Sequence, residues 1–405
     1  MNDRPDQELR RMVRSISQAS LSRRAAFGGL AAVAAAGVLS ACGSPAQGGK
    51  VASAAPTDLS DVDKLVNWSN WPLYMDEDAG KYPTLEAFTK KTGTKVNYTP
   101  DYLDNEEFFA KVQPLLAGGQ DTGRDMWVST DWMVARLISL GYIQPLNKDN
   151  IPNAANLEPS LKDVSYDPGR VYSLPWQGIF SGIGYNLERT GGRKVTSMDQ
   201  LLHDKTLKGK VVLLSEMRDT VGLMLMEQKK RLDNFTADDF ASAISTLQDA
   251  KDAGQLRGFS GNSYAEDLNQ GVVAASVVWA GDVAQLAVEN KNLGVTLPEA
   301  GFTVSYDNLV IPALAKHKTN AEKLINYYYD PAVMAEVSAY VNYLCPVVGV
   351  KDILLKSADK DKVAVASNQL VFPDEATMAR GQRFRALTPE EDTSFTRQYQ
   401  ALVTG

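Results

Sequence analysis

The sequence has little of what metal, redox and disulfide chemistry require. Its 405 residues include only two cysteines, Cys42 and Cys345, and two histidines, His203 and His317. Two cysteines cannot form a disulfide scaffold or a four-cysteine zinc site, and two histidines leave little room for a histidine-rich metal centre. The formal net charge of -7 argues against a nucleic-acid binder that relies on a broad basic face. We therefore expect no metal, no other cofactor and no nucleic-acid partner.

Motifs for phosphate binding and for nucleophilic catalysis are also missing. No P-loop is present, and the glycine-rich turn at 118–123 follows a predicted helix rather than a strand, which disfavours a phosphate cradle. No nucleophile is visibly paired with a histidine. The composition is that of an ordinary globular protein, with 44% hydrophobic and 22% charged residues. The length suits two or three domains or one large two-lobed domain.

The N-terminal segment is typical of an export signal. Arginines precede an apolar run of small residues at 25–39, which suits a signal-peptide core and is short for a membrane span. The run ends in Leu39-Ser40-Ala41-Cys42, which resembles a bacterial lipobox. We therefore predict a lipoprotein signal peptide over 1–41, lipid attachment at Cys42 and a flexible tether over 42–60. An uncleaved anchor helix is the alternative, and Arg23-Arg24 leaves the twin-arginine and general export routes both open.

Removal of this segment changes the charge of the remaining chain. Residues 1–41 hold six arginines against three acidic residues, a net +3, so the mature chain carries -10, which is -7 minus +3. Cys345 would then be the single unmodified thiol, and its apolar neighbours favour a buried small side chain over a reactive one. We expect the mature protein on the outer face of the cytoplasmic membrane, held there by lipid.

Beyond the tether, strand-like and helix-like segments alternate along the sequence. The strand-like runs are at 64–68, 94–98, 125–128, 210–214, 272–279 and 303–312. Amphipathic helical patterns separate them. This alternation predicts an α/β protein with mostly parallel sheets. In such sheets, ligands bind beyond the carboxyl ends of the strands.

Aromatic side chains and carboxylates recur near these predicted strand ends and in the late segments. They are Trp68, Trp71, Asp131, Glu216, Asp219, Trp279, Asp282, Asp307 and Tyr343. Carboxylates accept charge-assisted hydrogen bonds from ammonium groups, and aromatic faces attract cations and cover alkyl chains. The combination predicts a pocket for an organic cation with several amines. For each residue alone a structural role stays open, as core packing or as a carboxylate at a helix N-terminus.

Several short motifs follow one another in a fixed order between residues 64 and 355. They are Asn67-Trp68-Ser69, Phe88-Thr89-Lys90-Lys91-Thr92-Gly93, Val128-Ser129-Thr130, Tyr172-Ser173-Leu174-Pro175, Ile183-Gly184-Tyr185-Asn186, Trp279-Ala280-Gly281-Asp282-Val283 and Asp307-Asn308-Leu309-Val310-Ile311-Pro312. Their collinear order resembles that of the polyamine-binding subunits of bacterial ABC importers, the spermidine- and putrescine-binding proteins. The resemblance implies a type II periplasmic-binding-protein fold, with two α/β lobes joined by crossover strands and the ligand cleft between them.

The resemblance also implies domain boundaries. Lobe 1 would hold 61–180 plus 303–350, and lobe 2 would hold 181–302 plus 351–405. It implies ligand contacts that come from both lobes, namely Trp68, Ser69, Trp71, Ser129, Asp131, Glu216, Asp219, Trp279, Asp282, Asp307 and Tyr343. The chain departs from the spermidine branch at Asp131, where an aromatic residue is common, and at Ser305, where a tryptophan is usual. Whether Trp176 or Gln177 reaches the cleft is left open.

The function implied is a lipid-anchored, monomeric solute-binding subunit that captures a polyamine and delivers it to membrane permease subunits without chemistry on the ligand. Five candidate carboxylates exceed what a diamine needs, which favours a longer polyamine or mixed specificity. Three alternatives stay open. One is a cage of Trp68, Trp71 and Trp279 for a quaternary amine such as choline or betaine. The others are an exported glycoside hydrolase using Glu216 and Asp219, and a lipoprotein that only contacts other proteins.

Overall fold

The fold is built on one mixed sheet whose strands alternate with helices along the chain. The computed structural model describes residues 57–405, so the predicted signal peptide, Cys42 and most of the tether lie outside the described residues. The strands are β1 (Leu65–Ser69), β2 (Lys95–Thr99), β3 (Met126–Thr130), β4 (Ser173–Asn186), β5 (Val211–Leu214), β6 (Leu256–Ser260), β7 (Ala275–Trp279), β8 (Leu293–Thr296), β9 (Phe302–Val310) and β10 (Gly381–Gln382).

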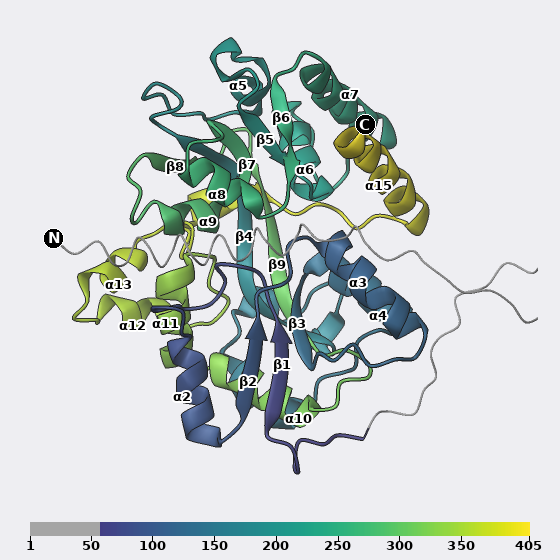
Figure 1. The fold of residues 1–405 in the computed structure, drawn as a ribbon, viewed down its shortest axis with the longest axis vertical. Coiled ribbons are helices and arrows are strands. Elements are labelled where there is room, and N and C mark those ends of the chain that lie inside the picture. Colours follow the sequence, from purple (N-terminus) through teal and green to yellow (C-terminus); the bar gives the residue numbers. More distant parts are fainter. Residues whose placement is uncertain (1–56) are drawn as a thin grey trace, which may run out of the picture. The chain divides into compact units, whose positions relative to one another are not determined.

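The helices cover the sheet and connect its strands (Figure 1). They are α2 (Pro83–Thr92), α3 (Asn105–Ala117), α4 (Asp131–Leu140), α5 (Met198–His203), α6 (Met217–Glu227), α7 (Ala237–Asp252), α8 (Ser263–Asn269), α9 (Ala280–Leu286), α10 (Lys318–Tyr328), α11 (Pro331–Val341), α12 (Val350–Leu355), α13 (Lys360–Val365), α14 (Glu375–Arg380) and α15 (Pro389–Thr404). Among the helices of the described part of the chain, none is both long and apolar enough to cross a membrane. The mixed α/β architecture confirms the predicted fold class.

Two groups of parallel strands are joined by two long antiparallel strands. The strand order is β2-β1-β3-β9-β4-β7-β5-β6, with β8 beside β4 and β10 beside β9. β1 pairs in parallel with β2 and β3, and β5 pairs in parallel with β6 and β7. β9 runs antiparallel to β3 and β4, and β4 runs antiparallel to β7. Figure 1 shows β4 and β9 running through the middle of the molecule, so both groups share these two strands.

The central strands are buried along their whole length, which explains their sequence. Every residue of β3, β4, β5 and β7 is buried, and for β5, which pairs in parallel with β6 and β7, this is usual of strands covered on both faces. Val211–Leu214 is accordingly a continuous apolar run without alternation.

The predicted lobe boundaries fall on the two long strands. The boundary at 180/181 lies inside β4, and the boundary at 302/303 lies at the start of β9. The described residues all belong to one compact unit. At the C-terminal end, α12 and α13 pack against α11, whereas α15 packs against α7. The division into two lobes therefore stays a prediction.

Candidate ligand-binding site

A cavity lies where the ends of β1, β3, β5 and β7 meet the middle of β4 and β9. Its volume, counted as the space that the centre of a water molecule can reach, is about 50 Å³. One water needs roughly 10–15 Å³ on this measure, so the cavity has room for several. Its size therefore suits a slender small molecule. Eight of the eleven predicted ligand residues line it: Trp71, Asp131, Glu216, Asp219, Trp279, Asp282, Asp307 and Tyr343.

Asp282 is a buried carboxylate held by three neutral donors. It lies in the first turn of α9 and is 1% exposed. It accepts hydrogen bonds from Asn262 Nδ2 at 2.9 Å, the Tyr264 hydroxyl at 2.7 Å and the Tyr343 hydroxyl at 2.6 Å. A Cβ at Gly281 would overlap the ring of Tyr343, so glycine lets that phenol reach the carboxylate. Burial raises the pKa of Asp282 to about 6, although the three hydrogen bonds favour its charged form.

Asp219 is held in a similar way by three different strands. It lies in the first turn of α6, where the helix dipole favours an anion. Its oxygens accept from Ser181 Oγ of β4 at 2.5 Å, Trp279 Nε1 of β7 at 3.1 Å and Thr303 Oγ1 of β9 at 3.1 Å. Burial raises the pKa of Asp219, and these hydrogen bonds counter the rise. The indole of Trp279 is thereby fixed against an acid.

Glu216 ties the end of β5 to the start of α3. One of its oxygens accepts from both the backbone N of Asn105 at 3.0 Å and Asn105 Nδ2 at 2.8 Å. Beside it, Ser215 Oγ donates to Asp104, the N-cap of α3, at 2.9 Å. Burial, together with the charges of Asp104 and Asp219, holds the pKa of Glu216 well above its ordinary value. The environment therefore favours the neutral form of this carboxyl group.

Asp307 lies on β9 and is 2% exposed. It accepts a hydrogen bond from Thr130 Oγ1 at 2.7 Å. Burial raises the pKa of Asp307 to about 7, against the lowering effect of this bond. The neighbouring Tyr74 hydroxyl is buried and makes no hydrogen bond with any described residue. Burial, then the charge of Asp307, raises the pKa of Tyr74 well above its ordinary value.

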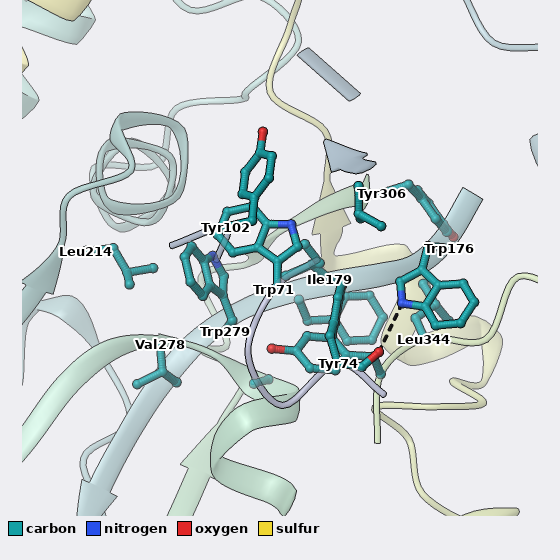
Figure 2. Packing of buried hydrophobic residues seen from close by; sticks show 14 of the residues in the cluster. Trp71, Tyr74, Tyr102, Trp176, Ile179, Leu214, Val278, Trp279, Tyr306 and Leu344 are labelled. Atoms are coloured by element: carbon teal, nitrogen blue, oxygen red, sulfur yellow. Dashed lines mark hydrogen bonds between the residues drawn. The ribbon is translucent and has the colours of Figure 1, made fainter. Parts of the chain in front are cut away.

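Aromatic rings form walls between these carboxylates. Trp71 and Trp279 meet edge to face, with ring centroids 5.3 Å apart. Tyr74 and Tyr343 do the same at 4.7 Å. Figure 2 shows Trp71 and Trp279 side by side. These pairs have the T-shaped geometry that aromatic quadrupoles prefer.

Two predicted or open candidates lie in the core instead. Trp68 is 1% exposed and packs against the rings of Tyr98, Trp176 and Tyr328. Trp176 is fully buried, and its Nε1 donates to the backbone carbonyl of Tyr74 at 3.2 Å, the dashed line in Figure 2. Both side chains lie outside the lining of the cavity. Trp176 therefore supports Tyr74 from behind rather than replacing a ring of the site.

The two predicted hydroxyl contacts also lie outside the cavity lining. Ser69 Oγ accepts from Arg124 Nε at 2.7 Å. Ser129 Oγ is hydrogen-bonded to the Tyr102 hydroxyl at 3.0 Å. Gln177, the other candidate left open, is fully buried on β4. Neighbouring strand residues point to opposite faces, so the cavity receives Thr130 rather than Ser129.

An arginine that the prediction did not include lines the cavity as well. Arg218 lies in the first turn of α6, and its guanidinium carbon is 4.0 Å from the ring centroid of Trp132. It donates to Asp392 of α15 at 2.7 Å. The other oxygen of Asp392 accepts from Arg136 of α4 at 2.7 Å. Phe384, which precedes α15, lines the same part of the cavity and lies 6.0 Å from the Arg218 guanidinium.

Asp131 lines the cavity and lies in the electrostatic field of two arginines. Its Oδ1 accepts from the backbone N of Trp132 at 2.7 Å. Burial raises the pKa of Asp131, while the charges of Arg383 and Arg218 lower it. Its negative charge is therefore partly balanced within the protein.

No cluster of three or more His, Cys, Asp or Glu side chains suited to a metal ion occurs within residues 57–405. Cys345 is a partly buried free thiol. Burial raises the pKa of Cys345 to about 11, which disfavours the reactive thiolate.

The fold and the cavity together define a class of protein. The sheet carries a ligand-sized cavity at its strand ends, and carboxylates and aromatic rings line that cavity. These features are typical of a protein that binds small molecules. Residues 84–365 match the model of the bacterial extracellular solute-binding protein family, and the chain belongs to this family. Its members bind solutes and are not enzymes.

Similar proteins bear names that refer to polyamines. The spermidine/putrescine-binding periplasmic protein of Escherichia coli is 27% identical over 80% of this chain and 87% of its own length. The putrescine-binding periplasmic protein of the same organism is 29% identical over 70% of this chain and 78% of its own. A solved spermidine/putrescine ABC transporter substrate-binding protein from Streptococcus pneumoniae superposes with a TM-score of 0.66 and 22% identity, covering 84% of this chain and 98% of that one. The fold is thus that of a type II periplasmic binding protein.

Proposed function

We propose that this chain is the solute-binding subunit of an ABC importer and captures a polyamine of the putrescine and spermidine class. The observation that carries the proposal is the convergence of Asp219, Asp282 and Asp307 on one cavity that is also lined by Trp71 and Trp279. Protonated amines need acceptors that bear negative charge, and the methylenes between them need apolar cover. The names of similar proteins from Escherichia coli support the same ligand class.

The geometry suggests how the ligand is held. Asp282 and Asp219 are each fixed by three neutral donors, so neither has a protein cation as a hydrogen-bond partner. An ammonium group supplies the missing positive charge at each carboxylate. The Trp71 and Trp279 rings cover the alkyl chain between the two ends. The ligand is captured and released unchanged, and permease subunits receive it.

A second candidate ligand is a quaternary amine such as choline or betaine. Trp71, Trp279 and Tyr343 line the cavity and supply rings for such a cage, although Trp68 does not. A quaternary amine has no N–H to donate, so it would use the faces of the rings and leave the carboxylates without hydrogen bonds. Competition between choline and putrescine therefore separates the two candidates.

Isothermal titration calorimetry with putrescine, cadaverine, spermidine, spermine, choline and betaine tests the proposal. We expect saturable binding of at least one polyamine, with no displacement by choline or betaine at tenfold excess. No saturable heat with any polyamine would contradict the proposal. Preferential binding of choline or betaine would instead support the hypothesis that the ligand is a quaternary amine.

Export and lipid anchoring at Cys42 complete the proposal. They rest on the lipobox-like Leu39-Ser40-Ala41-Cys42 and on the extracellular character of the family. Mass spectrometry of the mature N-terminus should find a lipidated Cys42. The Cys42→Ser variant should lose the lipid and fractionate away from membranes. Recovery of an unprocessed N-terminus in the membrane fraction would instead support the uncleaved anchor.

A further inference from the structure

Arg218 places a fixed positive charge in the wall of the cavity. Its guanidinium carbon lies 4.0 Å from the ring centroid of Trp132 of α4 and 6.0 Å from that of Phe384, two residues that are distant in sequence. Its side chain is 13% exposed and donates to Asp392 of α15 at 2.7 Å. Because three separate elements hold it, the guanidinium cannot leave the cavity without breaking the ion pair and the stacking. A cation of this kind in an amine-binding cavity requires an explanation.

The carboxylates of the cavity are not all available to a ligand. Asp131 lies in the field of Arg218 and Arg383. Glu216 is turned onto the backbone and side chain of Asn105. The charge of Asp131 is thus partly balanced by protein cations, and burial beside Asp104 and Asp219 favours the neutral form of Glu216. Neither carboxyl group therefore offers an ammonium group a full, free negative charge.

Three carboxylates remain for the ligand, namely Asp219, Asp282 and Asp307. Asp219 and Asp282 are held only by neutral donors of the protein, and Asp307 accepts from Thr130. Asp219 also lies in the field of Arg218, and although burial raises the pKa of Asp219, the charge of Arg218 lowers it. Among the described residues, Asp282 and Asp307 are therefore the two cavity carboxylates without a compensating protein cation, and two such groups match a dication. A third or fourth ammonium group of a longer ligand would have to lie beside Asp131 or Asp219, within the field of Arg218, or remain unpaired.

We propose that Arg218 is a specificity-determining residue that selects a short diamine over longer polyamines. This inference rests on the proposed function and refines its ligand. Like charges in a partly buried site repel strongly because the surroundings screen them poorly. Exclusion by a fixed unfavourable group is an ordinary route to specificity. The abundance of carboxylates in the sequence favoured a longer ligand, and the position of Arg218 reverses that inference.

Asp392 acts as a positioning residue for Arg218. Its two oxygens accept from Arg218 at 2.7 Å and from Arg136 at 2.7 Å. Arg136 also donates to Glu106 of α3 at 2.9 Å. Arg136 is outside the cavity lining, so it shares the ion cluster without facing the ligand. It therefore serves as the matched control for Arg218.

The test is calorimetric titration of putrescine and spermidine into the wild-type protein, Arg218→Gln, Arg218→Lys and Arg136→Gln. The measured quantity is the ratio of the spermidine Kd to the putrescine Kd. We expect the wild type to favour putrescine at least tenfold, about 1.4 kcal/mol. Arg218→Gln should lower the ratio about tenfold or more. Arg218→Lys keeps the charge and should keep most of the ratio, and Arg136→Gln should leave it within about threefold.

The outcomes separate this inference from the proposed function. Failure of the wild type to bind any polyamine would overturn both. A wild type that binds spermidine as tightly as putrescine would overturn the inference alone. An unchanged ratio in Arg218→Gln would also overturn it, as would an equal change in Arg136→Gln. Thermal melting of each variant, compared with that of the wild type, shows that a changed ratio comes from a folded protein.

Discussion

Two clusters that each contribute residues to the wall of the same cavity stabilise a buried charge in opposite ways. The Asp282 cluster (Asp282, Asn262, Tyr264 and Tyr343) surrounds a carboxylate with neutral donors and supplies no cation. The Arg218 cluster (Arg218, Asp392, Arg136 and Trp132) pairs its cation within the protein. Within the described residues, the two clusters share no hydrogen bond.

The difference teaches where a ligand cation belongs. A buried carboxylate without a cationic partner is costly, and a bound ammonium group removes that cost. A buried arginine that is already paired gains nothing from a ligand and repels another cation. The Asp282 cluster is therefore built to be completed by the ligand, whereas the Arg218 cluster is complete on its own.

The largest expected effect is the loss of charge at Asp282. Asp282→Asn should weaken putrescine binding about 10- to 150-fold, the range of a hydrogen bond to a charged group. The amide also presents its own donors to Asn262, Tyr264 and Tyr343, which leaves buried groups unpaired. Calorimetric titration measures the change. Asp238→Asn, at an exposed position of α7, is the control and should bind as the wild type does; equal affinities in the two variants would remove Asp282 from the site.

A smaller loss is expected at Asp307. Because its pKa is about 7, the carboxylate is only partly charged at neutral pH. Asp307→Asn should therefore cost about 1.5 kcal/mol at pH 7, near the lower end for a charged hydrogen bond. The loss should grow at pH 8.5, where the wild-type group is fully charged. A loss that is independent of pH would show that Asp307 does not act through its charge.

The pH dependence of wild-type binding follows from the same groups. Their raised pKa values, about 6 for Asp282 and about 7 for Asp307, mean that both carboxyls take up protons as the pH falls from 8 to 5.5. Alkyl ammonium groups with a pKa near 10 stay charged over this range. Putrescine affinity should therefore fall as the pH falls, and binding near pH 6.5 should release protons. Titration in buffers of different ionisation enthalpy measures that release, and proton uptake instead would contradict the account.

The same pKa values predict the stability of the ligand-free protein. An acid whose pKa is raised in the folded state binds more protons when folded than when unfolded, so stability decreases as the pH rises from about 4 to 7. Putrescine should reverse part of this trend by compensating the two charges. Thermal melts at pH 5.5 and 8 should show the larger putrescine-induced rise in Tm at pH 8. An equal rise at both values would contradict the assignment of charged carboxylates to the ligand.

The smallest expected effect is at Tyr343. Tyr343→Phe removes one of three donors to Asp282, which should raise the pKa of that carboxyl further. We expect putrescine binding about threefold weaker at pH 7, and a larger loss at pH 6. Gly281→Ala should have a similar effect, because the added Cβ displaces the ring of Tyr343. If Tyr343→Phe binds as the wild type does at both pH values, this hydroxyl does not support the charge of Asp282.

The sequence predicts helices and strands well where the hydrophobic pattern and the residues that begin or end an element, such as Pro and Gly, agree. The helix predicted at 83–91 is α2, Pro83–Thr92, which has Pro83 in its first turn and ends at Gly93 with a φ of 74°. The strand predicted at 210–214 is β5, Val211–Leu214. β4 was not predicted as a strand, because Pro175 and several glycines interrupt its apolar pattern. The structure explains one of them, since a Cβ at Gly178 would lie 2.6 Å from the ring of Tyr306.

The sequence predicts which kinds of side chain line the site better than it predicts which individual residues point into it. Residues just past strand ends, such as Asp219 and Asp282, follow from topology because parallel strands end at one edge. Successive residues of a strand point to opposite faces, so an error of one residue places the predicted side chain on the wrong face. The sequence therefore predicts Ser129 as a ligand contact, whereas its neighbour Thr130 lines the cavity. Arg218 lies between Glu216 and Asp219 in the sequence, so its position beside two predicted ligand residues could have indicated that it reaches the cavity. Phe384 carried no such signal, because its place depends on the long-range path of the C-terminal segment.

The most direct test of the central claim is a crystal structure of the protein with putrescine. The account predicts one ligand nitrogen within about 3.2 Å of an Asp282 oxygen, the alkyl chain between Trp71 and Trp279, and the second nitrogen beside Asp219 or Asp307. A ligand nitrogen against the Arg218 guanidinium would contradict the account. So would a cavity that stays empty at saturating putrescine.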